Sequence, residues 1–334
     1  MAIKLGIDMG STNTTIYRLN SGLVLREPSK ALCEVVGDKK VVKEVGNKAI
    51  KYLGKTPEHM MVISPIQDGI VDDVKVASKM LRTFVDKVTS DNPSASISAL
   101  LNIPCGASVE ECRKAILVGC NANITTLNLI PNVIACAVGA GVDLNSDQCV
   151  LIVDIGGGCT DIAVVGYASI LHGVTLNIGS GQMDIAIKKY IEDKFGISIS
   201  LASAEMLKEE IGSLLCRDIA TMQVNGVDMN TKELRSVVVN AGIICEAIQE
   251  YYEIIADTIS EILSQCNAEV MSNILSFGIV MCGKATKITG LEKFMLDRLG
   301  VSLHIIDGNC TANGLGILLN DKALTKKILQ NNTK

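Results

Sequence analysis

Two stretches of the chain share one pattern, in which an apolar strand reaches an aspartate and then a glycine-containing turn. The first is LGIDMGSTNT at residues 5–14, and the second is VLIVDIGGGCTD at residues 150–161. Glycine tolerates positive φ and exposes its backbone N–H group, so such a turn can wrap around a phosphate. One turn alone would be weak evidence, and two ordinary hairpin turns are the alternative. The pair predicts two similar halves with a polyphosphate between them.

Composition limits the classes of protein that fit. The 334 residues suffice for two domains or one large one, with an aliphatic core because aromatic residues make up only 3%. No apolar run reaches the roughly 18 residues of a membrane helix. A strand is predicted directly after the first residues, which leaves no room for a signal peptide. The net charge of −5 and the lack of a basic, aromatic-rich stripe argue against nucleic acid as a partner.

Cysteine usage points to a reducing compartment. The chain has 12 cysteines and 3 histidines but no C-x-x-C spacing, so no zinc site is expected. Many of the cysteines lie in apolar runs, as Cys136 and Cys149 do, and are interpreted as small buried hydrophobic residues. A cytoplasmic location fits this usage best.

Hydrophobic periodicity predicts strands and helices that alternate along the chain. Strands are expected at residues 3–7 and 14–19, and a hairpin at 222–233. Helices are predicted at residues 74–88, 108–120, 134–141, 183–195, 204–216, 241–263 and 311–319. Residues 323–334 could form a short amphipathic helix, although a solvated tail is favoured over a membrane contact.

The two glycine turns resemble the phosphate loops of the actin, Hsp70 and sugar-kinase superfamily. Further stretches resemble the bacterial actin MreB family, from about residue 3 to about 318; among them are GLVLREPSKAL, SPIQDGIVDD, GSGQMDIAIKKYIEDKFG and AEMLKEEIGS. The resemblance implies an α/β, actin-like fold of two similar lobes. Each lobe would hold a mixed β-sheet flanked by helices, with the nucleotide in the cleft between the lobes.

The resemblance also implies domain boundaries. The first domain would be residues 1–146 plus 320–334, with a small subdomain at about 30–75. The second would be residues 147–319, with a small subdomain at about 182–240.

The phosphate contacts implied by the resemblance come from both turns. The matching positions are Gly10, Ser11, Thr12 and Asn13 in the first turn and Gly156, Gly157, Gly158 and Thr160 in the second. Asp8 and Asp154 match the carboxylates on the magnesium side, acting through water. Two helix-capping aspartates are the structural alternative for this last pair. The expected cofactors are ATP or ADP and Mg²⁺.

The base of the nucleotide is expected at two further segments. Glu205, Lys208 and Glu209 lie within four positions, hence on one helix face, which contacts ribose and adenine in MreB. On the sequence alone, a solvated charged face is the commoner interpretation. The family's Gly-Gly-Gly-Ala turn beside the adenine is replaced by Gly283, Lys284, Ala285 and Thr286. Lys284 could crowd the base or reach it. An adenine nucleotide is the expected ligand, and guanine stays open as the alternative because the turn beside the base is altered.

Two departures from the family concern hydrolysis. Asn132 stands where MreB proteins have the glutamate that orients the attacking water, and Cys159 stands where they have a threonine. An amide can orient water but cannot take a proton, and a thiol is a poor hydrogen-bond partner. Loss of general-base help costs roughly 10²- to 10⁴-fold in rate. Slow ATP hydrolysis with nucleotide binding retained is therefore the hypothesis, and a filament ATPase with ordinary turnover is the alternative.

The expected function is that of a cytoskeletal filament protein for cell shape or cell organisation. Self-association into filaments rests on the resemblance alone, as does assembly with related actin-like paralogues; weak or no membrane contact is expected. A superfamily kinase or chaperone ATPase is the alternative from another class. A sugar kinase needs a polar sugar cleft, and an Hsp70-like chaperone needs a substrate domain after the nucleotide domain.

Overall fold

Two five-stranded sheets with the same strand arrangement form the framework of the chain. The computed structural model describes residues 2–37, 39–215, 217–306 and 309–332. The first sheet has the order β10-β9-β1-β2-β3, and the second has the order β13-β12-β11-β17-β18. The first sheet contains β1 (Ile3–Met9), β2 (Asn13–Arg18), β3 (Gly22–Pro28), β9 (Ile97–Ile103) and β10 (Thr126–Pro131). The second contains β11 (Val150–Ile155), β12 (Thr160–Gly166), β13 (Ser169–Leu176), β17 (Ile279–Cys282) and β18 (Leu303–Ile305).

Equivalent strands pair in the same way in both sheets. β1 is antiparallel to β2 and parallel to β9, and β11 is antiparallel to β12 and parallel to β17. Both sheets are therefore mixed, and the strand that carries Asp8 or Asp154 lies in the middle of its sheet. The prediction of two similar halves, each with a mixed sheet, is confirmed.

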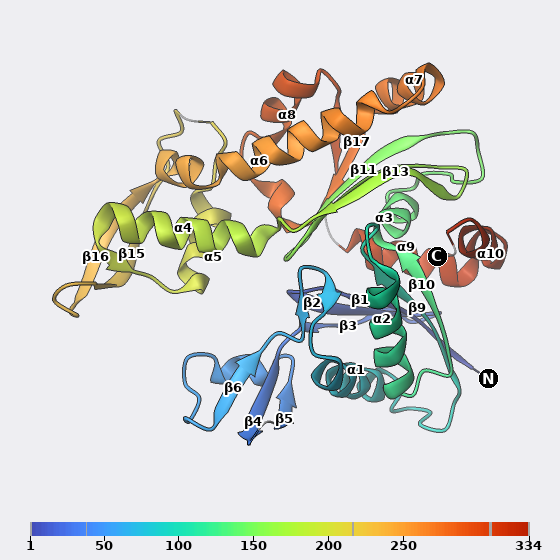
Figure 1. The fold of residues 1–334 in the computed structure, drawn as a ribbon, viewed down its shortest axis with the longest axis horizontal. Coiled ribbons are helices and arrows are strands. Elements are labelled where there is room, and N and C mark those ends of the chain that lie inside the picture. Colours follow the sequence, from blue (N-terminus) through green and yellow to red (C-terminus); the bar gives the residue numbers. More distant parts are fainter. Residues whose placement is uncertain (1, 38, 216, 307–308, 333–334) are drawn as a thin grey trace.

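Helices pack on both sheets (Figure 1). On the first sheet the helices are α1 (Val74–Val88) and α2 (Val109–Asn121), and on the second they are α4 (Ser180–Phe195) and α6 (Ala241–Ser264). α1 has the predicted bounds because its apolar residues recur at helical spacing and Asp73 caps it, accepting a hydrogen bond of 3.1 Å from the Val76 N–H. α2 begins at a capping box made by Ser108 and Glu111.

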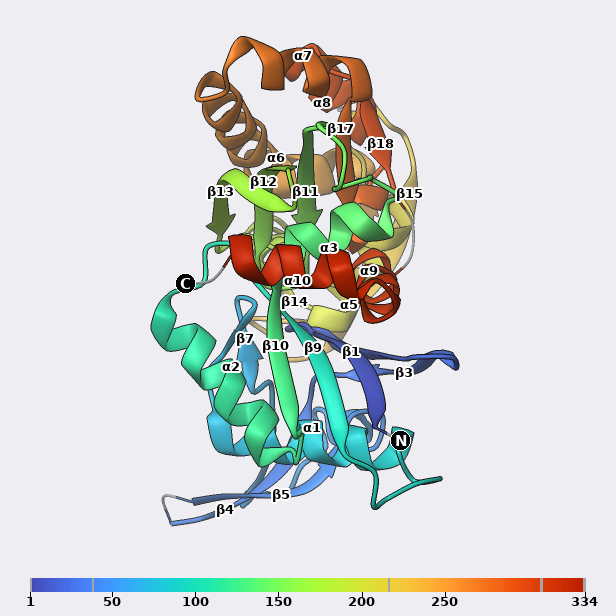
Figure 2. The ribbon, with the colours of Figure 1, turned by 90° about the vertical axis from the view of Figure 1, so that its right-hand side faces the viewer.

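Two short helices, α3 (Asn132–Gly139) and α9 (Cys310–Asn320), connect the halves. α3 follows the first sheet in sequence but packs against β11 and β12 of the second sheet. α9 follows the second sheet but packs against β1 and β2 of the first. The two helices pack on each other, and Figures 1 and 2 both place them between the sheets. This pair of helices therefore connects the two halves, and we call it the hinge.

Each half also has a small sheet at its outer end. The first contains β4 (Ala31–Val36), β5 (Lys39–Val45) and β6 (Met60–Ile63), with η1 (Ala49–Tyr52) beside it. The second contains β14 (Ile197–Ser198), β15 (Thr221–Asp228) and β16 (Leu234–Asn240), with α5 (Leu201–Ile211) beside it. The hairpin of β7 (Ile66–Gln67) and β8 (Ile70–Val71) joins the first small sheet to α1.

One predicted helix needs correction, and one helix was not predicted. The helix predicted at 204–216 is α5, which begins earlier because Ser200 caps it. It ends before Gly212, because the chain then turns away and the N–H of Leu214 donates to the carbonyl of Thr289. Residue 216 lies outside the described residues. A helix not predicted, α7 (Ala268–Phe277), precedes β17. α8 (Leu291–Leu299) follows the turn η2 (Lys284–Lys287).

The C-terminal segment is not a solvated tail over its described residues. It forms α10 (Lys322–Asn331), whose Leu324 and Ile328 are buried in a core shared with α3 and α9. Residues 333–334 lie outside the described residues. Among the described helices, none combines the length and the hydropathy that crossing a membrane requires.

Candidate functional site

The two glycine turns lie in contact across the gap between the lobes. A Cβ atom on Gly157 would lie 2.0 Å from Oγ1 of Thr12, and one on Gly158 would lie 2.6 Å from Oγ of Ser11. Contacts this short allow no side chain at either position without movement of a lobe. The structure thus brings residues 10–13 and 156–158 together, as the pair of motifs predicted.

Backbone N–H groups of both turns are available for a ligand. Gly10 and Gly156 use their N–H groups inside the turns, donating to the carbonyl oxygens of Asn13 at 3.1 Å and of Cys159 at 2.9 Å. In the part of the chain that the structure describes, no acceptor is found for the N–H groups of Ser11, Thr12, Gly157 and Gly158. Convergent free N–H groups of this kind bind anions such as phosphate.

The start of helix α4 supports the second turn. The N–H of Ser180 donates to the carbonyl of Gly156 at 2.9 Å, and that of Gly181 to the carbonyl of Gly157 at 2.8 Å. Nε2 of Gln182 donates to the carbonyl of Gly158 at 3.1 Å and to Oδ1 of Asp68, in the other lobe, at 2.9 Å. Gln182 therefore links the second turn to the first lobe.

Two carboxyl groups stand just before the turns, near the ends of their strands. Burial, and then the charge of Asp154, raise the pKa of Asp8 to about 7, although Asn102 donates a hydrogen bond of 2.7 Å to it. Burial, and then the charge of Asp161, raise the pKa of Asp154 to about 6. Neighbouring buried carboxyl groups repel each other when ionised. A divalent cation would relieve this repulsion, so the donor set fits Mg²⁺.

Asn132, the first residue of α3, bridges this carboxylate cluster. Its Nδ2 donates to Oδ2 of Asp154 and, at 3.2 Å, to Oδ2 of Asp161. Its Oδ1 accepts from Nδ2 of Asn102 at 3.2 Å, and the Asn102 side chain also accepts from the N–H of Met9 at 2.8 Å. The amide thus donates hydrogen bonds to two carboxyl groups without adding a charge. A carboxylate in its place would add a further charge to the cluster.

Sequence reasoning missed Asn102 and Asp161 as members of this network. Asp161 is the last residue of the second motif, DIGGGCTD, so the motif itself could have predicted it as a site residue. Burial raises the pKa of its carboxyl group. Asn102 lies in β9, whose only signal was an apolar run. Its role follows from the parallel pairing of β9 with β1, which local sequence does not reveal.

The two residues after the second glycine turn do not face the cleft in the same way. Cys159 is buried, and a Cβ atom on Gly69 would lie 2.5 Å from its Sγ, so the thiol packs against the first lobe. Thr160 is fully buried, and its hydroxyl donates to the carbonyl of Ile178 at 2.6 Å. The hydroxyl of Thr160 therefore donates its proton to the backbone, and the phosphate contact that the resemblance implies for this residue stays a prediction.

A cavity of about 410 Å³ lies at the turn of residues 283–288, and residues of both halves line it. Its wall is formed by Lys208, Glu209, Tyr252, Gly283, Lys284, Ala285, Lys287, Ile288 and, from the first lobe, Arg26. Gly283 joins the cavity to the carboxylate cluster. Its φ is +99°, and a Cβ atom there would lie 2.0 Å from the carbonyl oxygen of Ile155 and 3.1 Å from Oδ1 of Asp154. The hydroxyl of Tyr252 holds the same turn by donating to the carbonyl of Ala285 at 2.7 Å.

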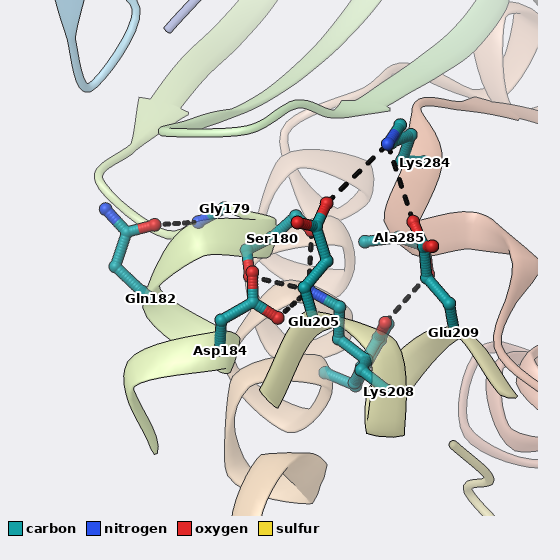
Figure 3. Close-up of polar contacts among 10 residues, drawn as sticks. Gly179, Ser180, Gln182, Asp184, Glu205, Lys208, Glu209, Lys284 and Ala285 are labelled. Carbon is teal, nitrogen blue, oxygen red and sulfur yellow. Dashed lines mark hydrogen bonds and ion pairs between the residues drawn. The ribbon is translucent and has the colours of Figure 1, made fainter. Parts of the chain in front are cut away.

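Lys208 is buried rather than free on its helix face (Figure 3). Its Nζ pairs with the carboxylate of Asp184 and donates to the carbonyl of Ser180 at 2.8 Å and to the hydroxyl of Ser180 at 2.6 Å. The ammonium group thus ties α5 to the first turn of α4. A solvated charged face is the wrong interpretation for this residue.

Lys284, which replaces a glycine of the family's turn, forms ion pairs with two glutamates of α5. Its Nζ lies 3.6 Å from Oε1 of Glu205 and 3.4 Å from Oε1 of Glu209 (Figure 3). The lysine therefore bridges two carboxylates at the cavity mouth. Thr286 is buried and donates to the carbonyl of Gly283 at 2.8 Å, which stabilises the turn itself.

Arg26 is a candidate that sequence reasoning missed. In the sheet it is paired with Thr15, which is paired with Asp8, so the three side chains point to the same face. Its charge lowers the pKa of Asp8, and its side chain lines the cavity. Among the described residues it has no ion-pair partner. The first lobe thus presents to the cavity a cation that acts on Asp8 without a direct ion pair among the described residues.

Similarity to known proteins extends over nearly the whole chain. Residues 2–327 match the family described as MreB/Mbl protein. The cell shape-determining protein MreB of Escherichia coli (strain K12) is 32% identical over 320 residues, which are 93% of this chain and 92% of that protein. The crystal structure of MreB5 of Spiroplasma citri bound to AMPPNP is 25% identical and covers 99% of both chains, with a TM-score of 0.89. A MamK double helical filament, 19% identical, matches in fold with a TM-score of 0.80 and covers 96% of this chain and 99% of the other.

Proposed function

The chain belongs to the MreB/Mbl family and has an actin-like fold, and we propose that it binds ATP with Mg²⁺ in the interlobe cleft and polymerises into filaments. The observation that carries the nucleotide proposal is the contact between the two turns, at Thr12 and Gly157, with free N–H groups on both sides. The AMPPNP in the S. citri MreB5 structure supports the same class of ligand.

The residues present fit each part of the nucleotide. Residues 10–13 and 156–158 would hold the phosphates, and the cavity beside Gly283 and Lys284 would hold the base. Asp8 and Asp154 would hold Mg²⁺ through water, and the ion would offset the charge of the phosphates. Arg26 would add a second cation from the first lobe.

The affinity for Mg·ATP is expected to fall as the pH drops through about 7 and then about 6. Mg²⁺ needs ionised ligands, and the pKa is about 7 for Asp8 and about 6 for Asp154. Each protonated carboxyl group costs about tenfold in affinity per pH unit below its pKa. Binding of ATP in EDTA serves as the control. Equal pH dependence with and without Mg²⁺ would contradict the assignment.

The same carboxyl groups predict how stability depends on pH. Their pKa values are raised above 3.8 in the folded protein, so between about 4 and about 7 the folded state holds more protons than the unfolded state. The free energy of unfolding of the nucleotide-free protein is therefore expected to decrease as the pH rises through this range. Urea unfolding at a series of pH values, without Mg²⁺, measures it.

Replacing Arg26 with glutamine is expected to weaken ATP binding by about 10- to 100-fold. A charged hydrogen bond contributes about 1.5–3 kcal/mol, and Arg26 has no competing ion-pair partner among the described residues. Arg113→Gln is the control, because that exposed side chain lies on α2 with only a loose pairing of 3.9 Å to Glu110. Titration of labelled ATP compares the two variants, and equal affinity would remove Arg26 from the site.

Filament formation is the part of the proposal that concerns cell shape. The E. coli relative is a cell shape-determining protein, and the MamK structure is a double helical filament. We expect the purified chain to sediment as filaments with Mg·ATP and to stay in the supernatant without nucleotide. Phosphorylation of a sugar without nucleotide-dependent sedimentation would favour the kinase class instead. Assembly with related paralogues and a cytoplasmic location are part of the same proposal.

The proposal also includes slow hydrolysis of the bound ATP. Asn132 cannot accept a proton, and its amide is engaged by three neighbours, Asn102, Asp154 and Asp161. Cys159 turns its thiol toward Gly69. Neither residue supplies a base for an attacking water, so turnover is expected to be limited by this step.

A further inference from the structure

Three cysteines gather at the hinge, beside Asp154. Sγ of Cys136 lies 3.3 Å from Sγ of Cys282 and 3.7 Å from Oδ2 of Asp154. Sγ of Cys136, Sγ of Cys282 and a carboxylate oxygen of Asp154 all lie within 4.8 Å of one another. Cys310 lies beside this group, and its thiol donates to the carbonyl oxygen of Cys136 at 3.2 Å. The prediction that Cys136 is buried is confirmed, but its thiol has polar neighbours.

The spacing of these atoms suits a thiophilic cation. Tetrahedral zinc with Zn–S bonds of about 2.3 Å and Zn–O bonds of about 2.1 Å places two sulfur ligands about 3.8 Å apart, and a sulfur and an oxygen about 3.6 Å apart. The observed 3.3 Å and 3.7 Å differ from these by half an ångström or less. Two thiolates and a carboxylate would also compensate the charge that a buried dication brings.

Two neighbours already orient the ligand atoms. The hydroxyl of Thr311 lies 3.0 Å from Sγ of Cys136, and Nδ2 of Asn132 donates to Oδ2 of Asp154. Such outer hydrogen bonds fix the position of metal ligands. The ligands come from α3, β11 and β17. This dispersal explains why cysteine spacing in the sequence predicts no zinc site.

We propose that Cys136, Cys282 and Asp154 form a binding site for a thiophilic divalent cation of the zinc type. The cation would displace the thiol protons to solvent and tie α3 to the second sheet. This site shares Asp154 with the proposed Mg²⁺ site but goes beyond the proposed nucleotide function, because it also uses two thiols that no phosphate or Mg²⁺ requires.

Cobalt titration of the reduced, nucleotide-free full chain tests the proposal. We expect one Co²⁺ per chain, with sulfur-to-cobalt charge-transfer absorption that Zn²⁺ removes and Mg²⁺ does not. Cys136→Ala combined with Cys282→Ala should abolish the absorption. Cys112→Ala combined with Cys120→Ala, which removes two thiols of α2, should leave it unchanged. Absence of the band in the unaltered chain, or its persistence in the first double variant, would overturn the site.

Thr311→Val provides a test that preserves all ligands and nearly the same side-chain shape. Loss of the hydroxyl beside Cys136 should lower the affinity for Co²⁺ by about 10- to 100-fold. Thermal unfolding in the absence of metal serves as the check that the variants are folded. Because the readout is metal binding without nucleotide, failure of ATP binding leaves this result unaffected. An unchanged affinity for Co²⁺ in folded Thr311→Val would contradict the proposed coordination by Cys136.

Discussion

Replacing Gly157 with alanine is expected to weaken Mg·ATP binding by about 10- to 100-fold. The added Cβ would meet Oγ1 of Thr12 at 2.0 Å and Cβ of Thr12 at 3.0 Å, so the two turns must separate. Over-packing of this kind costs about 1–3 kcal/mol. The cost appears in binding because the free N–H groups on the two turns no longer converge on the phosphates. Titration of the purified variant with a fluorescent ATP analogue measures the change.

A second variant distinguishes lobe separation from local damage. Thr12→Ala removes the closest clashing atom, so affinity in Gly157→Ala with Thr12→Ala should recover relative to Gly157→Ala alone. Thr12→Ala by itself sets the baseline, and the four measurements form a double-mutant cycle. Additive losses, with no recovery in the double variant, would contradict a contact between the two turns.

Hydrolysis of bound ATP is expected to rise by roughly 10²- to 10⁴-fold when Asn132→Glu is combined with Cys159→Thr. The glutamate supplies a group that can take a proton from water, and the threonine supplies a hydroxyl at the second departure. The glutamate also adds a charge beside Asp154 and Asp161 and removes the amide donor that they share. The variant should therefore depend on Mg²⁺ for stability more than the unaltered chain does. Phosphate release in single turnover measures the rate.

Asn132→Gln is the matched control for this experiment. It keeps an amide and supplies no base, so phosphate release should stay slow while nucleotide binding is kept. A rate in the unaltered chain equal to that of an ordinary MreB ATPase would contradict the assigned effect of Asn132. A double variant that folds, binds ATP and remains slow would contradict it as well.

Local signals predicted much of the fold. The bounds of α1 follow from its amphipathic spacing and from Asp73, which starts it. The end of α5 was misjudged because Leu214 leaves the helix for a hydrogen bond with Thr289, far along the chain. α7 stands between α6 and β17, and among its residues only Ile274 is fully buried.

Some residues of the candidate site could be predicted from sequence motifs, and others became apparent only in the structure. Glycines in both turns were visible as motifs, whereas their contact depends on the packing of two distant halves. Arg26, Asn102 and Cys282 carry no motif, and they enter the cleft or hinge through strand pairing and helix crossing. The partner of Lys208, Asp184, lies on another helix, so no helix-face argument could find it.

A structure of the chain with Mg²⁺ and AMPPNP tests the central claim most directly. The account predicts the triphosphate between residues 10–13 and 156–158, the Mg²⁺ beside Asp8 and Asp154, and the base in the cavity at Lys284. A nucleotide bound anywhere else, with the two turns empty at saturating ligand, would contradict it.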